Sequence, residues 1–96
     1  MIERRVTVGW ADGLHARPAS IFVRAATAAG VPVTIARKGG EPVNAASLLA
    51  VLTLGAERGE EVVLGSPAED EDAARAAVER LARLVSEGLE ELPETV

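Results

Sequence analysis

A histidine and an arginine two residues apart are the side chains of this sequence best suited to chemistry. His15 is the only histidine among the 96 residues, and it lies with Arg17 in the segment GLHARPAS. Pro18 indicates the first turn of a helix, because N–H groups there have no partner within the helix and proline is tolerated. Unpaired N–H groups and the positive end of the helix dipole favour a bound anion such as phosphate.

The same residues suit the transfer of a phosphoryl group. A neutral imidazole is a nucleophile that can form a covalent intermediate near neutral pH. The guanidinium of Arg17 offers planar donors for phosphoryl oxygens, and the backbone amides of Ala16 and Arg17 would complete a phosphate cradle. The alternative is that His15 is only a surface or capping residue, as a lone histidine near a helix start commonly is.

Two motifs together indicate a family. GLHARPAS, followed by NAASLLAVLTLG, resembles HPr, the histidine-containing phosphocarrier family of the phosphoenolpyruvate:sugar phosphotransferase system. The resemblance extends from Val6 to about Leu89. It implies that His15 accepts a phosphoryl group from phospho-enzyme I, which phosphoenolpyruvate charges, and passes it to IIA domains of sugar permeases. The expected protein is a stoichiometric carrier with a phosphohistidine intermediate, not an enzyme, and needs no cofactor.

Ser47 in the second motif has two interpretations. It aligns with the serine that a dedicated kinase phosphorylates in some HPr proteins, so the resemblance implies a regulatory site. An HPr serine kinase/phosphatase or a transcriptional regulator would then be a further partner. The alternative is a plain N-cap of a short helix, which stabilises by about 1 kcal/mol, with Asn44 as the other candidate cap.

Three leucines of the second motif could form a docking surface. The resemblance implies that Leu48, Leu49 and Leu52 bind enzyme I and IIA domains beside His15. A small exposed apolar patch suits a transient complex. The alternative is that one or more of these leucines belong to the core.

Composition restricts the class of protein. Hydrophobic residues make up 48% of the chain, but only one Phe and one Trp are present, so the core must be aliphatic. The absence of cysteine excludes a disulfide framework, and one histidine without cysteine gives no metal site. No apolar run approaches the ~20 residues that span a bilayer, and no signal peptide opens the chain. We expect a cytoplasmic monomer without membrane insertion.

Charge is distributed unevenly. Residues 1–40 contain six basic and two acidic side chains, whereas residues 41–96 contain four basic and thirteen acidic ones. The basic part contains His15 and can steer an acidic partner or a phosphoryl group toward it. Scattered basic residues without stacking aromatics are a weak footprint for nucleic acid, so no nucleic-acid partner is expected. The basic residues expected to be solvated surface charges are Arg4, Arg5 and Arg24.

Hydrophobic periodicity predicts seven elements. Strands are expected over residues 2–8, 32–37, 41–43 and 61–65, and helices over 16–28, over 48–52 or 53, and up to about 86. The expected apolar stripes are Ala19, Phe22, Val23 and Ala26 in the first helix, and Ala74, Val78, Leu81 and Val85 in the last. Pro42 cannot donate to a ladder, so its strand should lie at a sheet edge.

Three local expectations concern the connections. The last helix can begin in two ways, because residues 66–69 have capping-box spacing while the acidic residues 70–72 complement the helix dipole. Trp10 in the loop 9–13 is expected to cover the edge of the sheet. The tail over residues 89–96 is expected to be loose.

The element order β-α-β-β-α-β-α is satisfied by one four-stranded antiparallel sheet with three helices on one face. The resemblance implies the same α/β (α+β) fold, an open-faced β-sandwich with strand order 1-4-2-3. We expect residues 1–96 to form a single HPr-like domain.

Two other classes of function remain for comparison. An HPr-like interaction module that binds transcription factors or enzymes without carrying phosphate would not need a nucleophile, so the presence of His15 and Arg17 disfavours it. A small hydrolase or metal site would need a nucleophile–base pair or ligand cluster, which this composition does not offer. The phosphocarrier is the leading hypothesis.

Overall fold

The computed structural model describes residues 1–88, and the expected loose tail lies outside this described part. The elements are β1 (Ile2–Thr7), α1 (Ala16–Thr27), β2 (Thr34–Arg37), β3 (Val43–Asn44), α2 (Leu48–Leu54), β4 (Glu61–Ser66) and α3 (Glu71–Glu87). The predicted element order is confirmed, and the predicted boundaries differ from the observed ones by one or two residues.

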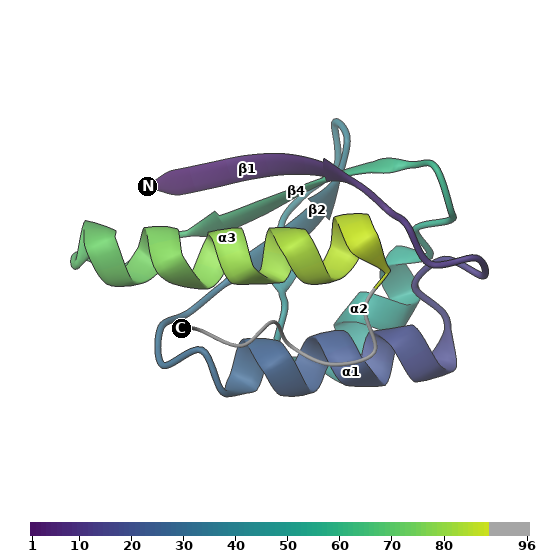
Figure 1. Cartoon of the computed structure of the whole chain (residues 1–96), viewed down its shortest axis with the longest axis horizontal. Helices are drawn as coiled ribbons and strands as arrows, with labels where there is room; N and C mark the ends of the chain where they lie inside the picture. The colour runs from purple at the N-terminus through teal and green to yellow at the C-terminus, as the bar shows by residue number, and fades with distance from the viewer. Residues whose placement is uncertain (89–96) are drawn as a thin grey trace.

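The four strands form one antiparallel sheet in the order β1-β4-β2-β3, which confirms the predicted topology. Its register pairs Val6 with Val62 and Ile35 with Leu64, so apolar side chains share one face. The three helices lie on that side, as Figure 1 shows, and the opposite face stays open. β3 forms the edge directly after Pro42, as the missing N–H of proline predicts.

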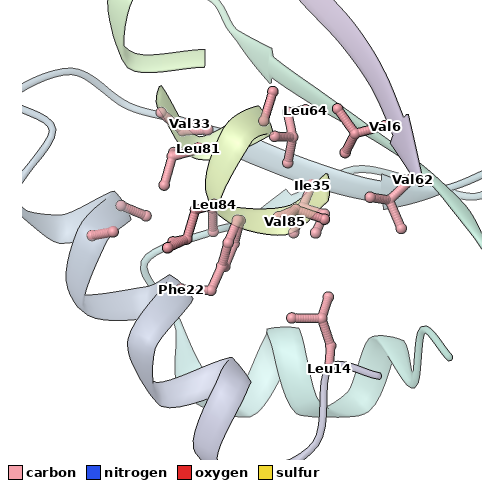
Figure 2. Close-up of a cluster of buried hydrophobic side chains, with 14 of the residues drawn as sticks. Val6, Leu14, Phe22, Val33, Ile35, Val62, Leu64, Leu81, Leu84 and Val85 are labelled. Carbon is pink, nitrogen blue, oxygen red and sulfur yellow. The ribbon is translucent and has the colours of Figure 1, made fainter. Parts of the chain in front are cut away.

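The core lies between the sheet and the helices and is aliphatic apart from Phe22 and Trp10. Figure 2 shows Val62 and Leu64 of β4 on one side of this cluster, with Phe22 of α1 and Leu84 of α3 on the other. All four residues are completely buried. The contact between helices and sheet therefore fixes the position of α1, the helix that follows His15.

Trp10, for which the sequence predicts a position over the sheet edge, is also part of the core: its side chain is 6% exposed and belongs to the core cluster. An indole buries a large apolar area, so the loop folds inward around it. In α1 the stripe is rotated, because Ala25 is buried whereas Val23 is only half-buried. The stripe predicted for α3 is buried in full: Ala74, Val78, Leu81 and Val85.

Ser47 is the N-cap of α2, as one interpretation of the sequence predicts. Its hydroxyl oxygen accepts a hydrogen bond from the N–H of Ala50 at 3.3 Å. Asn44, the other candidate cap, instead accepts from the N–H of Ala46 just before the helix. Gly55 ends α2 in the left-handed conformation, with φ of 66°.

The capping-box interpretation of residues 66–69 is wrong. α3 begins after Asp70, whose carboxylate accepts from the N–H of Ala73 at 3.1 Å. Ser66 is the last residue of β4 and is completely buried, and its hydroxyl donates to the carbonyl of Pro32 at 2.7 Å. A buried hydroxyl needs such a partner. Because the strand continues one residue further than predicted, Ser66 is not at the start of the helix.

Arg4 is not simply a solvated charge. Its guanidinium forms an ion pair with Glu79 of α3, with N–O distances of 2.5 and 2.7 Å. Both side chains are 49% exposed, so the pair contributes less than about 1 kcal/mol to stability. It ties the outer strand β1 to α3. Arg5, by contrast, makes only a long ion pair with Glu61, at 4.0 Å, and its side chain is 75% exposed.

Candidate functional site

The loop between β1 and α1 begins against the C-terminal end of α3. The N–H of Gly9 donates to the carbonyl of Val85 at 2.9 Å. A Cβ atom added at Gly9 would lie 2.3 Å from the carbonyl oxygen of Ser86, closer than real Cβ atoms come. Any larger residue would therefore push the loop away from α3. Glycine at this position lets the two backbones touch.

The same loop ends against residues 56–58. The N–H of Leu14 donates to the carbonyl of Ala56 at 2.8 Å, and the Leu14 side chain is buried in the core. Gly13 has φ of +71°, and a Cβ atom there would lie 2.6 Å from the carbonyl oxygen of Ala56. The backbone of Gly13 is therefore packed directly against the backbone of Ala56, just before His15. The position of the histidine is thus fixed by the connection between α2 and β4, about 40 residues away in sequence.

His15 is the N-cap residue of α1, in an extended conformation with φ of −91° and ψ of −167°. Its carbonyl accepts from the N–H of Ala19 at 2.8 Å, so the backbone begins the helix. The imidazole makes no capping hydrogen bond and is exposed. The interpretation of His15 as a side-chain cap is therefore wrong, and the ring is accessible from solvent.

The first turn of α1 presents N–H groups to an anion. Pro18 carries no N–H, and the amides of Ala16 and Arg17 precede it in the first turn, where backbone N–H groups point toward the N-terminal end of the helix. Both residues are exposed, and the first turn contains no acidic side chain that would offset the helix dipole. The predicted cradle residues thus lie together next to His15 at the positive end of a helix.

A hollow of about 340 Å³ lies beside the histidine. Its lining residues are Ala11, Asp12, His15, Glu57 and Arg58. The charged residues of this lining are absent from the sequence prediction of the site. Asp12 stands in the same loop and could have been noticed there, but the residues of the α2–β4 connection are brought to His15 only by tertiary structure.

The second motif presents its leucines outward. Leu48, Leu49 and Leu52 are 43%, 76% and 39% exposed, whereas Val51 between them is completely buried. α2 packs against α1, the helix that His15 opens (Figure 1). The expectation of an exposed apolar patch is confirmed, and the alternative that these three leucines belong to the core is wrong.

Ser47 stands at the start of this patch. A second hollow of about 520 Å³ runs from β3 along α2, and Ser47 and Leu49 are among its lining residues. The serine hydroxyl is half-buried and caps the helix, and the regulatory interpretation of Ser47 stays a prediction.

Residues 1–88 contain neither a cluster that could bind a metal nor a helix that could span a membrane. No group of three or more His, Cys, Asp or Glu side chains in this part of the chain could hold a metal ion. None of the helices that the structure describes combines the length and apolarity needed to cross a membrane.

The fold and the site together define a class: a small sheet protein with an accessible histidine at a helix N-terminus. A family model described as the PTS HPr component phosphorylation site matches residues 2–87. The phosphocarrier protein HPr of Streptomyces coelicolor is 76% identical to this chain over 96 residues, covering 100% of both sequences.

Solved structures give the same result. An HPr from Bacillus anthracis superimposes with a TM-score of 0.78 at 32% identity, covering 88% of this chain and 95% of its own. Crh from Bacillus subtilis, described as a dimer with domain swapping, gives a TM-score of 0.67 at 35% identity, covering 97% of this chain and 100% of its own. The chain belongs to the HPr family, the phosphocarrier proteins of the phosphotransferase system.

Proposed function

We propose that His15 accepts a phosphoryl group from phospho-enzyme I and passes it to IIA domains of sugar permeases. The observation that carries this proposal is the exposed imidazole at the N-cap of α1, which takes no part in capping the helix. A donor protein can therefore reach its ring nitrogens. We also propose that the protein acts in the cytoplasm, as one HPr-like domain.

The proposed transfer is a displacement at phosphorus. The ring nitrogen without hydrogen attacks with its lone pair, and the N–P bond forms while the bond to the donor breaks. The electron pair of that broken bond stays on the donor. The ring gains positive charge, which the loss of its N–H proton to solvent can relieve. Family resemblance suggests Nδ1 as the attacking nitrogen. The same exchange with a IIA domain as acceptor returns His15 to its starting state.

A carrier must release the group that it accepts, and the surroundings of His15 suit this. The guanidinium of Arg17 and the amides of the first turn stabilise charge that develops on the phosphoryl oxygens. Asp12 and Glu57 line the adjacent hollow, and their negative charges oppose tight retention of a phosphoryl dianion. Exposure to solvent weakens both contributions. Such a balance supports a carrier more than an enzyme with a closed pocket.

Intact mass spectrometry tests the proposal. After incubation with enzyme I and phosphoenolpyruvate, the protein should gain one phosphoryl group that acid removes, because N–P bonds are acid-labile. The HPr of Streptomyces coelicolor serves as the positive control for the enzyme I preparation. No gain in mass, in a mixture where that control is phosphorylated, would contradict the proposal.

Arg17→Ala should slow phosphoryl acceptance by about ten-fold, since a charge-assisted hydrogen bond to the transition state contributes about 1.5 kcal/mol or more. Initial rates with limiting phospho-enzyme I give the measurement. Arg24→Ala, an exposed residue in the last turn of α1, is the matched control and should keep the wild-type rate. Equal rates for Arg17→Ala and wild type would remove Arg17 from the mechanism.

The leucine patch of α2 is the proposed docking surface for enzyme I and IIA domains. Leu48, Leu49 and Leu52 combine exposure with a position beside α1, so a partner seated on them would bring its own phosphoryl site near His15. Burial of such apolar side chains contributes affinity, while the small area keeps the complex transient.

We further propose that phosphorylation of Ser47, by an HPr serine kinase/phosphatase, regulates this docking surface. Ser47→Asp tests the effect of negative charge and should slow acceptance from phospho-enzyme I by about three-fold, because a charge at the rim of an interface chiefly changes the association rate. Ser47→Asn is the matched control: both substitutions cap a helix well, but Asn is neutral. The proposal fails if the two variants accept phosphate at the same rate.

A purely regulatory adaptor is the second candidate, since the neighbour Crh is described as a catabolite repression protein. The presence of His15 and Arg17 favours the carrier, because an adaptor has no need of either. We propose that the protein acts as a monomer. The alternative is a domain-swapped dimer, as described for Crh. A transcriptional regulator stays a candidate partner under either function.

A further inference from the structure

Arg58 lies on the α2–β4 connection and lines the same hollow as His15. We propose that Arg58 contacts the phosphoryl oxygens when His15 is phosphorylated, from the side of the hollow opposite the backbone of α1. This inference rests on the proposed phosphorylation of His15. Arg58 would be a second cationic side chain at the phosphoryl site, in addition to Arg17, and it comes from a segment that is distant in sequence.

The backbone places Arg58 close to the histidine. Gly13 is two residues before His15, and a Cβ atom added there would lie 3.1 Å from the backbone nitrogen of Arg58. An arginine side chain is long enough to extend from this point across a hollow of about 340 Å³. The contact between the two backbones therefore sets the origin of the guanidinium within reach of the ring.

A rigid turn holds this residue. The N–H of Glu60 donates to the carbonyl of Glu57 at 3.0 Å, and Gly59 has φ of +86°, as the third residue of a type II turn requires. Arg58 is the second residue of that turn. The N–H of Gly59 also donates to the carbonyl of Val8 at 3.0 Å, which fastens the turn to the end of β1. A positioned donor loses less entropy on binding than one on a mobile loop.

The charge on Arg58 is not committed elsewhere in residues 1–88. Arg4, Arg37 and Arg83 form ion pairs closer than 3.1 Å with carboxylates, whereas Arg58 forms none with any carboxylate of this part of the chain. Asp12 and Glu57 line the same hollow as Arg58. The guanidinium is therefore available to an added anion, and its planar donors fit phosphoryl oxygens.

The experiment uses the full-length protein in its phosphorylated form. Phosphoramidate, which phosphorylates histidine without enzyme I, loads His15 in wild type, Arg58→Gln and Arg75→Gln. The ³¹P NMR signal is then followed against pH. A nearby guanidinium favours the dianion and lowers the pKa of the phosphoryl group, so Arg58→Gln should titrate at higher pH than wild type. Arg75→Gln, an exposed arginine in the first half of α3, should titrate as wild type does.

A second measurement follows acceptance from phospho-enzyme I, where Arg58→Gln should be about five-fold slower than both wild type and Arg75→Gln. Coinciding titration curves for wild type and Arg58→Gln would overturn the inference, even if the wild-type protein is a competent carrier. Loading by phosphoramidate but not by enzyme I would instead contradict the proposed donor, and the titration would still decide the role of Arg58. A wild-type protein that neither reagent phosphorylates would end both proposals.

Discussion

His15→Ala protein will gain no phosphoryl group from enzyme I and phosphoenolpyruvate. His15 supplies the only imidazole of the chain, and no cysteine is present as another strong nucleophile. Serine and threonine hydroxyls are weak nucleophiles without an adjacent general base. Loss should therefore be complete within the sensitivity of intact mass measurement, rather than a reduction in rate.

The structure also predicts that this variant stays folded, which makes the loss interpretable. The imidazole is exposed and makes no capping hydrogen bond, and the backbone carbonyl of His15 begins α1. A substitution of this kind changes the free energy of unfolding by about 0.5 kcal/mol or less. Denaturant unfolding of His15→Ala checks this. An acid-labile phosphoryl group on the folded variant would refute the assignment of His15.

Gly13→Ala should destabilise the protein by about 2–5 kcal/mol. Alanine at a left-handed φ costs about 1–2 kcal/mol, and overlap with well-packed neighbours adds about 1–3 kcal/mol. Both terms apply at Gly13, whose φ is +71° and whose added Cβ would lie 2.6 Å from a backbone oxygen of Ala56. The free energy of unfolding in urea gives the measurement.

Gly39→Ala separates the cost of the left-handed backbone conformation from the cost of steric overlap. Gly39 has φ of +76°, and a Cβ atom there would meet nothing within 4 Å, so this variant reports the backbone term alone. The difference between the two variants measures the close contact between the His15 loop and residues 56–58. Equal destabilisation would show that the contact is looser than described. Gly13→Ala should also slow phosphoryl acceptance, because its Cβ displaces the segment that leads to His15.

The starts of α1 and α2 could be predicted because they depend on residues that are close in sequence. Ser47 caps α2 and Pro18 lies in the first turn of α1, as their residue types favour. The sequence pattern did not settle the start of α3, because burial in the tertiary structure decided between the two candidate starts. Ser66 has the spacing of a cap, but β4 extends through it and its hydroxyl bonds the Pro32 carbonyl instead. A local pattern carries no information about such a distant partner.

The same limit applies to the site. His15 and Arg17 were predictable because they share one turn with the amides that would hold an anion. Arg4 was assigned to the surface because its partner, Glu79, comes from elsewhere in the chain. The burial of Trp10 in the core was not predicted for the same reason. Arg58 was missed for the same reason, since only the contact between Gly13 and the α2–β4 connection brings it to the histidine.

A phosphoryl carrier requires an exposed acceptor, and the imidazole of His15 is exposed. An acceptor in a closed pocket would bind the phosphoryl group more firmly, but a second protein could not reach it. In the mechanism that we propose, the N-terminus of α1 and Arg17 favour the group, while Asp12 and Glu57, which line the adjacent hollow, limit its retention. The leucines of α2 offer a small apolar surface on a helix that packs against α1. These features suit the short-lived complexes with two successive partners that we propose.

A transfer experiment in two stages tests whether this protein carries a phosphoryl group from one protein to another. The protein is labelled with enzyme I and radioactive phosphoenolpyruvate, separated from both, and then mixed with a IIA domain. We predict that label leaves this protein and appears on the IIA domain in equal amount, faster than it is lost to water in a mixture without IIA. Label that never enters the protein, or that leaves it only as inorganic phosphate whether or not the IIA domain is present, would contradict its function as a phosphoryl carrier.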